Sequence, residues 1–107
     1  MRHNDDLIAK KLSVLGHPIR LAIIRLLVRA GPSGLSAGAI GRKLDTAPNA
    51  LTFHLQKLTH ASLVNNQRDG QFIIYRAEFD ELLNLTDSLV GTCCADSPEK
   101  CGSRCPN

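Results

Sequence analysis

Hydrophobic residues recur at helical spacing through most of the chain, and their pattern predicts a mainly α-helical protein. In the fourth predicted helix, Leu51, Leu55 and Leu58 stand at i, i+4 and i+7 and form one apolar stripe. Polar positions and helix-breaking residues separate the apolar segments. The pattern predicts helices from Asn4 or Asp5 to Leu15, Pro18 to Ala30, Ala37 to Leu44, Thr46 to Val64, and Glu78 to Val90.

The apolar period changes after the fourth helix and predicts a β-hairpin. Leu63–Arg68 and Gln71–Ala77 are strand-like segments that flank Asp69-Gly70. Asp-Gly between two extended segments is a strong hairpin signal, because both turn positions favour positive φ. A hairpin that directly follows the second helix of a helix-turn-helix is typical of the wing in a winged helix protein.

The third and fourth predicted helices have the spacing of a helix-turn-helix. Ser36 can cap the third helix through its hydroxyl oxygen, and Asp45-Thr46 forms a short connection to the fourth. Thr46 is the predicted N-cap of the fourth helix, and Pro48 stands in its first turn, where a missing N–H has no cost. The predicted fold is therefore a winged helix-turn-helix.

The polar side of the fourth helix has amide, hydroxyl and basic groups and no acidic residue. Such groups can hydrogen-bond to base edges or to phosphates, and Phe53 can add an apolar contact to a thymine methyl or a sugar. An ordinary solvent-exposed helix is the alternative interpretation. We expect DNA contacts from Asn49, Thr52, Phe53, Gln56 and Lys57 on this helix, and from Arg68 and Gln71 at the tip of the wing.

Charge and length support a small DNA-binding domain. The chain has 107 residues, a length that suits a single domain. Its formal net charge is +3. Residues 1–76 contain eleven Lys and Arg against four Asp and Glu, whereas residues 77–107 contain two against six. A basic body favours phosphate contact, although unevenly charged solvated faces would give the same count. We expect a cytoplasmic protein, since the sequence has no long apolar segment.

The terminal helices predict a homodimer. The apolar stripe of the last helix is long for an element that follows a completed core, so it requires another surface to cover it. A second copy of the chain is the simplest partner, and the first helix would pack beside it. The expected dimer interface comprises Leu7, Ile8, Leu12, Phe79, Leu82, Leu83 and Leu89.

Four segments, in this order, resemble the ArsR/SmtB family of metal-responsive repressors. They are LGHPIRLAIIRLL (Leu15–Leu27), LSAGAIGRKL (Leu35–Leu44), LTFHLQKLTHASLV (Leu51–Val64) and QRDGQFIIYR (Gln67–Arg76). The resemblance implies a homodimer of winged helix-turn-helix protomers that binds a near-palindromic operator on double-stranded DNA and is released by an inducing ion. His54 matches the family pattern and can face either the DNA or the core.

The cysteines follow the last helix, as in the arsenic-sensing members of that family. All four lie in the last fifteen residues, so residues 5–91 form the predicted DNA-binding and dimerisation domain and residues 92–107 the inducer-binding tail. Soft thiolates select thiophilic ions, and trivalent arsenic or antimony takes three sulfur ligands. The predicted ligands are Cys93, Cys94 and Cys101, with Cys105 as a further candidate.

The sequence departs from other family sites and leaves alternatives open. The third helix has no thiol, and residues 78–91 contain no His, which disfavours the zinc site that other members carry there. A redox response of the thiols, another soft metal, a methylated arsenite on two sulfurs, and ordinary free thiols remain alternatives. No Cys-x-x-Cys occurs, which disfavours a thiol oxidoreductase, so we expect no enzymatic activity and no catalytic cofactor.

Overall fold

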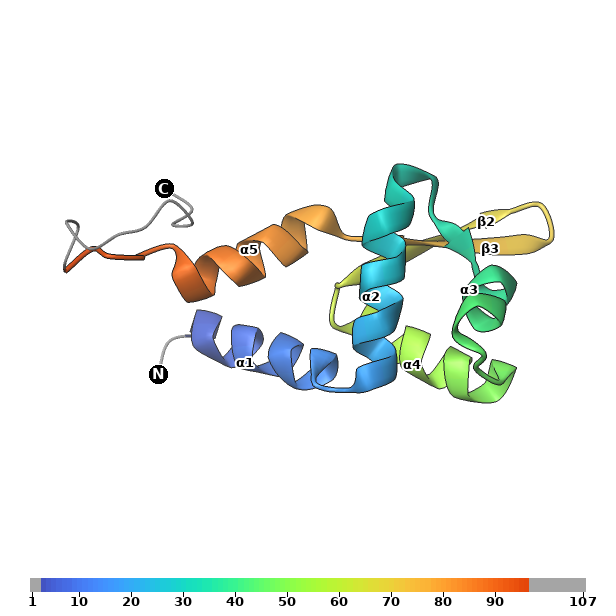
Figure 1. Ribbon diagram of the computed structural model, residues 1–107, viewed down its shortest axis with the longest axis horizontal. Helices are drawn as coiled ribbons and strands as arrows, with labels where there is room; N and C mark the ends of the chain where they lie inside the picture. Colours follow the sequence, from blue (N-terminus) through green and yellow to red (C-terminus); the bar gives the residue numbers. More distant parts are fainter. Residues whose placement is uncertain (1–2, 97–107) are drawn as a thin grey trace.

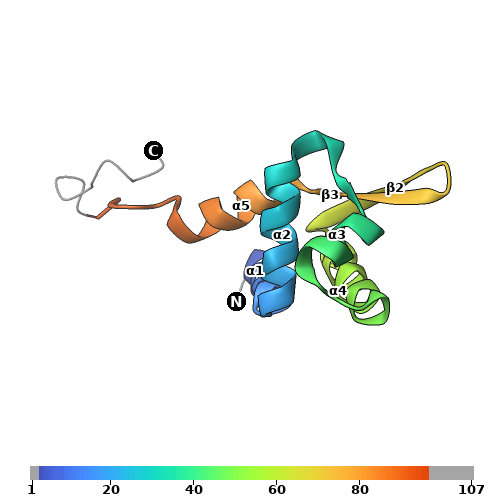
Figure 2. The ribbon, with the colours of Figure 1, turned by 45° about the vertical axis from the view of Figure 1, so that its right-hand side comes forward.

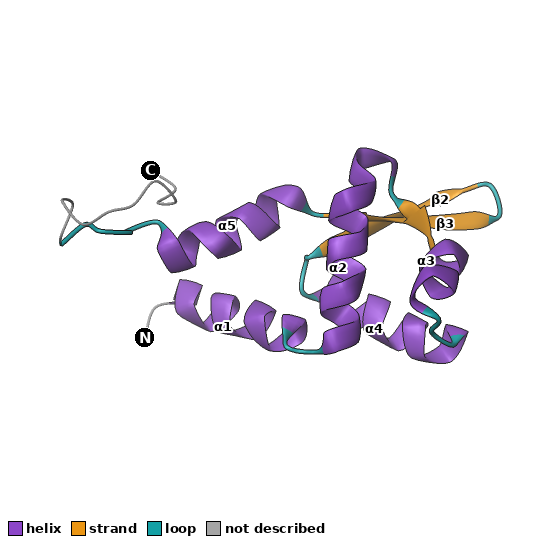
Figure 3. Ribbon diagram, viewed as in Figure 1, coloured by secondary structure: helices purple, strands orange, loops and turns teal. Residues whose placement is uncertain are grey.

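The computed structural model describes residues 3–96, which form a helical body with a small antiparallel sheet and a protruding hairpin (Figures 1 and 3). The predicted helices are confirmed, with several boundaries matching to the residue. A short 3₁₀ turn, η1 (Gly31–Ser33), follows the second helix. The α-helices are α1 (His3–Leu15), α2 (Pro18–Ala30), α3 (Ala37–Leu44), α4 (Pro48–His60) and α5 (Phe79–Val90).

The sheet contains one strand that the sequence pattern did not predict. β2 (Val64–Asp69) and β3 (Phe72–Ala77) form the expected hairpin, and β1 (Leu35–Ser36) pairs with the other edge of β3. Leu35 stands opposite Tyr75 in this antiparallel pair. A two-residue strand has no periodicity of its own, so only its partner defines it.

The hairpin turn lies one residue later than predicted. Asp69 pairs with Phe72, so the two loop residues are Gly70 and Gln71 rather than Asp69 and Gly70. Gly70 has a φ of 64°, whereas Gln71 is not among the residues with positive φ. This is the sign pattern of a type II′ turn, which places glycine first.

The predicted limits of the fourth helix were wrong at both ends. Its N-cap is Ala47, without a side-chain hydrogen bond, and the hydroxyl of Thr46 instead donates to the carbonyl of Leu44 at 3.2 Å. At the other end the N–H groups of Ser62 and Leu63 donate to carbonyls of the last turn, at 3.0 Å each. This is a Schellman motif with Ser62 at the left-handed position, φ 63°, so no glycine marks the end of the helix.

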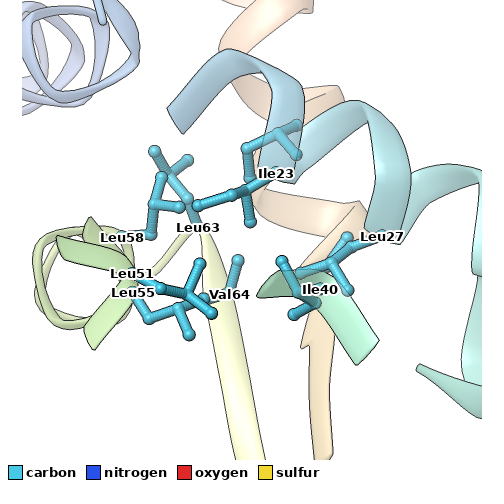
Figure 4. Packing of buried hydrophobic residues seen from close by; sticks show 10 residues of the cluster. Ile23, Leu27, Ile40, Leu51, Leu55, Leu58, Leu63 and Val64 are labelled. Atoms are coloured by element: carbon cyan, nitrogen blue, oxygen red, sulfur yellow. The ribbon is translucent and has the colours of Figure 1, made fainter. Parts of the chain in front are cut away.

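The core lies where α2, α3 and α4 meet the base of the hairpin (Figure 4). The leucine stripe of α4 packs there as predicted. Half-buried side chains from α1 and α5 extend this core outward. Its most completely buried members are Ile23, Leu27, Ile40, Leu55, Leu58, Leu63 and Val64.

Helices α1 and α5 lie side by side and extend away from the helix-turn-helix in Figure 1, and α5 also does so in Figure 2. Leu85 is the buried residue of α5, although it was not part of the predicted stripe. Lys11 Nζ on α1 and Glu81 Oε2 on α5 form a salt bridge of 2.5 Å. Within the part of the chain that the structure describes, no helix is long and apolar enough to cross a membrane.

Candidate nucleic-acid interface and thiol site

Helix α4 has one buried face and one exposed face. Its buried residues are Leu51, His54, Leu55 and Leu58. The residues predicted to read DNA are all on the other side and all exposed. We call this the reading surface, and its members are Asn49, Thr52, Phe53, Gln56 and Lys57.

Helix α3 supports α4 at close range. Ser36 caps α3, because its hydroxyl oxygen accepts from the N–H of Ala39 at 3.1 Å, as predicted. A Cβ on Gly41 would lie 3.3 Å from the Thr46 carbonyl oxygen and 3.4 Å from a Leu51 methyl. The small residue therefore allows the two helices of the helix-turn-helix to approach closely, and an open groove runs between them beside Thr52.

Phe53 is the most apolar part of the reading surface, and the residue is 51% exposed. Two cations lie near its ring. The guanidinium carbon of Arg20 is 5.7 Å and the ammonium nitrogen of Lys57 is 5.3 Å from the ring centroid. Both distances are within the range of cation–π attraction.

His54 faces inward, which decides between the two orientations that the sequence left open. Its ring centroid lies 4.5 Å from that of His17, and its Nδ1 accepts a hydrogen bond from Arg20 Nε at 3.1 Å. Burial lowers the pKa of His54 below its usual 6.5, and the nearby His17 and Arg20 lower it further. The imidazole is therefore neutral near pH 7.

The wing is fixed at its base and open at its tip. Arg76 Nε donates to the carbonyl of Pro32 at 2.8 Å, and Arg76 Nη1 donates to the side chain of Gln67 at 3.3 Å. Arg68 and Gln71, the predicted wing contacts, are exposed at the tip. No role for Arg76 follows from the sequence, because only the tertiary fold brings Pro32 next to it.

The predicted dimer residues fall into two groups. Leu7, Leu12, Leu83 and Leu89 are exposed, with Leu83 at 65%. Ile8 is half-buried. By contrast, Phe79 and Leu82 pack against the core of their own protomer, so they offer less free surface.

The described part of the predicted thiol site is the pair Cys93 and Cys94, which follows α5. Their Sγ atoms are 3.6 Å apart, and the Cys93 N–H donates to the carbonyl of Val90 at 2.9 Å. Cys93 is disulfide-bonded, whereas Cys94 is a free cysteine. Within residues 3–96 no three His, Cys, Asp or Glu side chains gather at one point. Cys101 and Cys105 lie outside the described residues.

The helix-turn-helix and its adjacent hairpin define the protein as a winged helix-turn-helix protein. A family model described as a helix-turn-helix domain matches residues 15–67. The nodulation protein NolR of Rhizobium meliloti is 34% identical over 89 residues, which are 82% of this chain and 70% of NolR.

Two further proteins are similar to this chain, the first in sequence and the second in fold. The transcriptional regulator YgaV of Escherichia coli strain K12 is 30% identical over 80% of this chain and 85% of its own length. An ArsR-like transcriptional regulator from Rhodococcus sp. RHA1 superimposes with a TM-score of 0.76 at 23% identity, over 92% of this chain and 90% of that chain. The chain belongs to the ArsR/SmtB family of winged helix-turn-helix transcriptional regulators. It is a DNA-binding transcriptional repressor and not an enzyme.

Proposed function

We propose that the chain is an inducer-responsive repressor, which binds operator DNA as a homodimer and releases it when trivalent arsenic or antimony binds its C-terminal thiolates. The observation that carries the proposal is the place of Cys93 and Cys94. They directly follow α5, whose exposed leucines form part of the expected dimer surface. A change at the thiols can therefore act on the contact between protomers.

The reading surface supports sequence recognition by α4. Amide and hydroxyl groups of Asn49, Thr52 and Gln56 are exposed together and can bond to base edges in the major groove. Lys57 on the helix and Arg68 on the wing can contact phosphates, which makes binding depend on salt concentration.

The reading role is tested with the double variant Thr52→Ala, Gln56→Ala. It should lose discrimination between a selected operator duplex and a shuffled duplex, while non-specific binding persists. Thr86→Ala is the matched control, because this exposed threonine lies on α5, away from the reading surface. Equal discrimination in the double variant and the wild type would remove α4 from base recognition.

The homodimer is supported by exposed leucines that continue from α1 to α5. Leu7 and Leu83 are 58% and 65% exposed, values that suit a surface covered by a second copy. A two-fold dimer would place two α4 helices about 34–36 Å apart, one turn of the duplex. This geometry explains why a small change of angle between protomers would weaken binding to both half-sites.

Once the disulfide of Cys93 is reduced, Cys93 and Cys94 can contribute two ligands to one ion. Metal–sulfur bonds of about 2.3 Å allow two ligand sulfurs to lie up to about 4.6 Å apart, and the observed separation is 3.6 Å. Cys101, with Cys105 as an alternative, would complete a three-sulfur set. Free thiols are largely protonated at neutral pH, so ligation releases protons. The coupling between this site and DNA needs about 1–3 kcal/mol of differential binding.

A redox-responsive repressor is the second candidate, because Cys93 is disulfide-bonded in the structure. Here two thiols lose two electrons and two protons to an oxidant, and the disulfide takes the place of the ion as the signal. The same fold and the same α5 would transmit either signal.

One titration separates the two candidates. Operator binding is measured in excess reductant with As(III), Sb(III), Cd(II) or Zn(II), and in a separate arm with a peroxide oxidant and no reductant. Release by As(III) or Sb(III) that is lost in the Cys93→Ser, Cys94→Ser and Cys101→Ser variants supports metalloid sensing. Release only in the oxidant arm favours the redox candidate, and release in neither arm contradicts both.

A further inference from the structure

A cluster of polar side chains lies directly behind the reading surface, where the first turn of α2 meets α4. Arg20 is half-buried, and His54 is buried with only 7% of its surface exposed. The ring of His17, the N-cap of α2, contacts the His54 ring at an interplanar angle of 55°. The cluster touches Phe53, so it connects the interior to a side chain of the reading surface.

Arg20 joins three elements through one rigid group. Its Nε donates to His54 Nδ1 at 3.1 Å, and its Nη1 donates to the Val14 carbonyl at 3.3 Å, near the end of α1. The same guanidinium lies 5.7 Å from the centroid of the Phe53 ring. Because the guanidinium is planar, two hydrogen bonds fix its orientation and so fix the surface that it offers to the ring.

The hydrogen bonds also determine which ring nitrogen carries the proton in each neutral histidine. His54 Nδ1 accepts from Arg20, and His17 Nδ1 accepts from the N–H of Ile19 at 3.2 Å. A nitrogen that accepts carries no proton, so each neutral ring holds its proton on Nε2. Protonated His54 would present an N–H to the Arg20 N–H, and the hydrogen bond between them could not form.

We propose that Arg20 and His54 are positioning residues that hold the Phe53 ring in its reading orientation, so that operator discrimination requires neutral His54. The proposal rests on the proposed reading role of Phe53. An exposed aromatic ring must lose rotational freedom when it binds DNA, and a ring already held by its neighbours loses less. The charged and titratable groups that act on His54 are Arg20 of α2 and His17, the N-cap of that helix.

Three variants test the positioning role. Arg20→Lys keeps the charge but loses the planar guanidinium that donates two hydrogen bonds at once. His54→Leu keeps the bulk but loses the ring nitrogen that accepts from Arg20. Each should lower the ratio of operator to shuffled-duplex affinity on the order of tenfold. His54→Asn places an amide oxygen near the position of Nδ1, so it should stay within about threefold of the wild type. The operator here is a duplex selected by the wild-type protein from a random library.

The same variants in a Phe53→Ala background show whether the effect passes through the ring. Without Phe53, Arg20→Lys and His54→Leu should no longer change the ratio, since residues that act through a shared partner are not additive. Full additivity, or no effect of either variant when Phe53 is present, would overturn the positioning role. If Phe53→Ala alone leaves the ratio unchanged, the reading role of Phe53 is wrong instead.

A measurement on the free protein keeps the positioning contact testable without DNA. The Arg20 Nε–H signal in a ¹⁵N–¹H NMR spectrum should be resolved and slow to exchange when His54 is neutral. It should be lost with the same midpoint as the His54 ring titrates, and His54→Asn should retain it to lower pH. An Arg20 signal that does not change as His54 titrates would contradict the hydrogen bond between Arg20 and His54. The ratio of operator to shuffled-duplex affinity should fall over the same pH range in the wild type, and it should not fall in His54→Asn.

Discussion

Lys11 Nζ on α1 lies 2.5 Å from Glu81 Oε2 on α5, and this salt bridge joins residues that are seventy positions apart. It holds the two terminal helices together at the edge of the surface expected to form the dimer. The side chains are 21% and 39% exposed, so water screens much of the attraction.

Lys11→Met and Glu81→Gln should each have a small effect on the free energy of unfolding. A double-mutant cycle should give a coupling of about 1 kcal/mol or less, measured by urea unfolding at low salt. The coupling should decrease at high salt. A coupling that does not depend on salt would show that the two side chains interact through packing rather than charge.

Gly34 marks the closest approach between the chain after η1 and β3. A Cβ there would lie 2.4 Å from the Tyr75 carbonyl oxygen and 2.8 Å from Arg76 Cγ, at a φ of 68°. Gly34→Ala should therefore destabilise the fold by backbone strain plus a steric clash, each about 1–3 kcal/mol.

Gly31→Ala is the matched control for Gly34→Ala. Gly31 has a φ of 74° but nothing within 4 Å of an added Cβ, so only the strain should appear. Thermal unfolding of both variants would give the cost of the clash by difference. Equal losses of stability in the two variants would mean that β3 shifts to relieve the clash at no cost in free energy.

Ser36 and Thr46 precede the two helices of the helix-turn-helix, but only Ser36 caps its helix. Ser36→Ala should destabilise the protein by about 1 kcal/mol, because the Ala39 N–H loses its acceptor. Thr46→Ala should cost less, since its hydroxyl donates to a carbonyl and does not cap α4. Chemical denaturation of the two variants checks this order, and a larger loss for Thr46→Ala would reverse the assignment.

Leu83→Glu should convert the protein to monomers if the exposed leucines of α1 and α5 form the dimer surface. A charge in a buried apolar interface has no partner, so association should weaken by at least about tenfold. Sedimentation equilibrium measures the change, and Val28→Glu on α2, at 44% exposure, is the control. An unchanged dimer would place the interface elsewhere.

His54 should make folding stability depend on pH. Its pKa in the folded protein is lowered by burial and by its neighbours, so the unfolded chain binds the proton more strongly. The contribution of His54 to the free energy of unfolding is complete above its pKa in the unfolded chain, about 6.5. That contribution is lost as the pH falls through its lower pKa in the folded protein.

The His54→Asn variant isolates this term. The difference in unfolding free energy between wild type and variant should be constant above about pH 7 and should shrink as the solution is acidified. Urea unfolding at several pH values measures it. A difference that is independent of pH would mean that His54 titrates alike in the folded and unfolded chain.

The sequence by itself determined the helices, the hairpin and the two faces of α4. Each of these depends on a local pattern, such as the leucine spacing of α4 or the glycine in the hairpin turn. The exposed positions of Asn49, Thr52 and Gln56 followed from the same spacing, because a helix that buries one face must expose the other.

Only the tertiary structure decided the features that depend on contacts between distant segments. β1 exists because Leu35 and Ser36 lie beside β3, and Leu85 is buried because α1 lies beside α5. The inward orientation of His54 depends on Arg20, thirty-four positions earlier in the chain. A local pattern cannot specify such a pair, since neither residue alone indicates which hydrogen-bond partner the fold will bring to it.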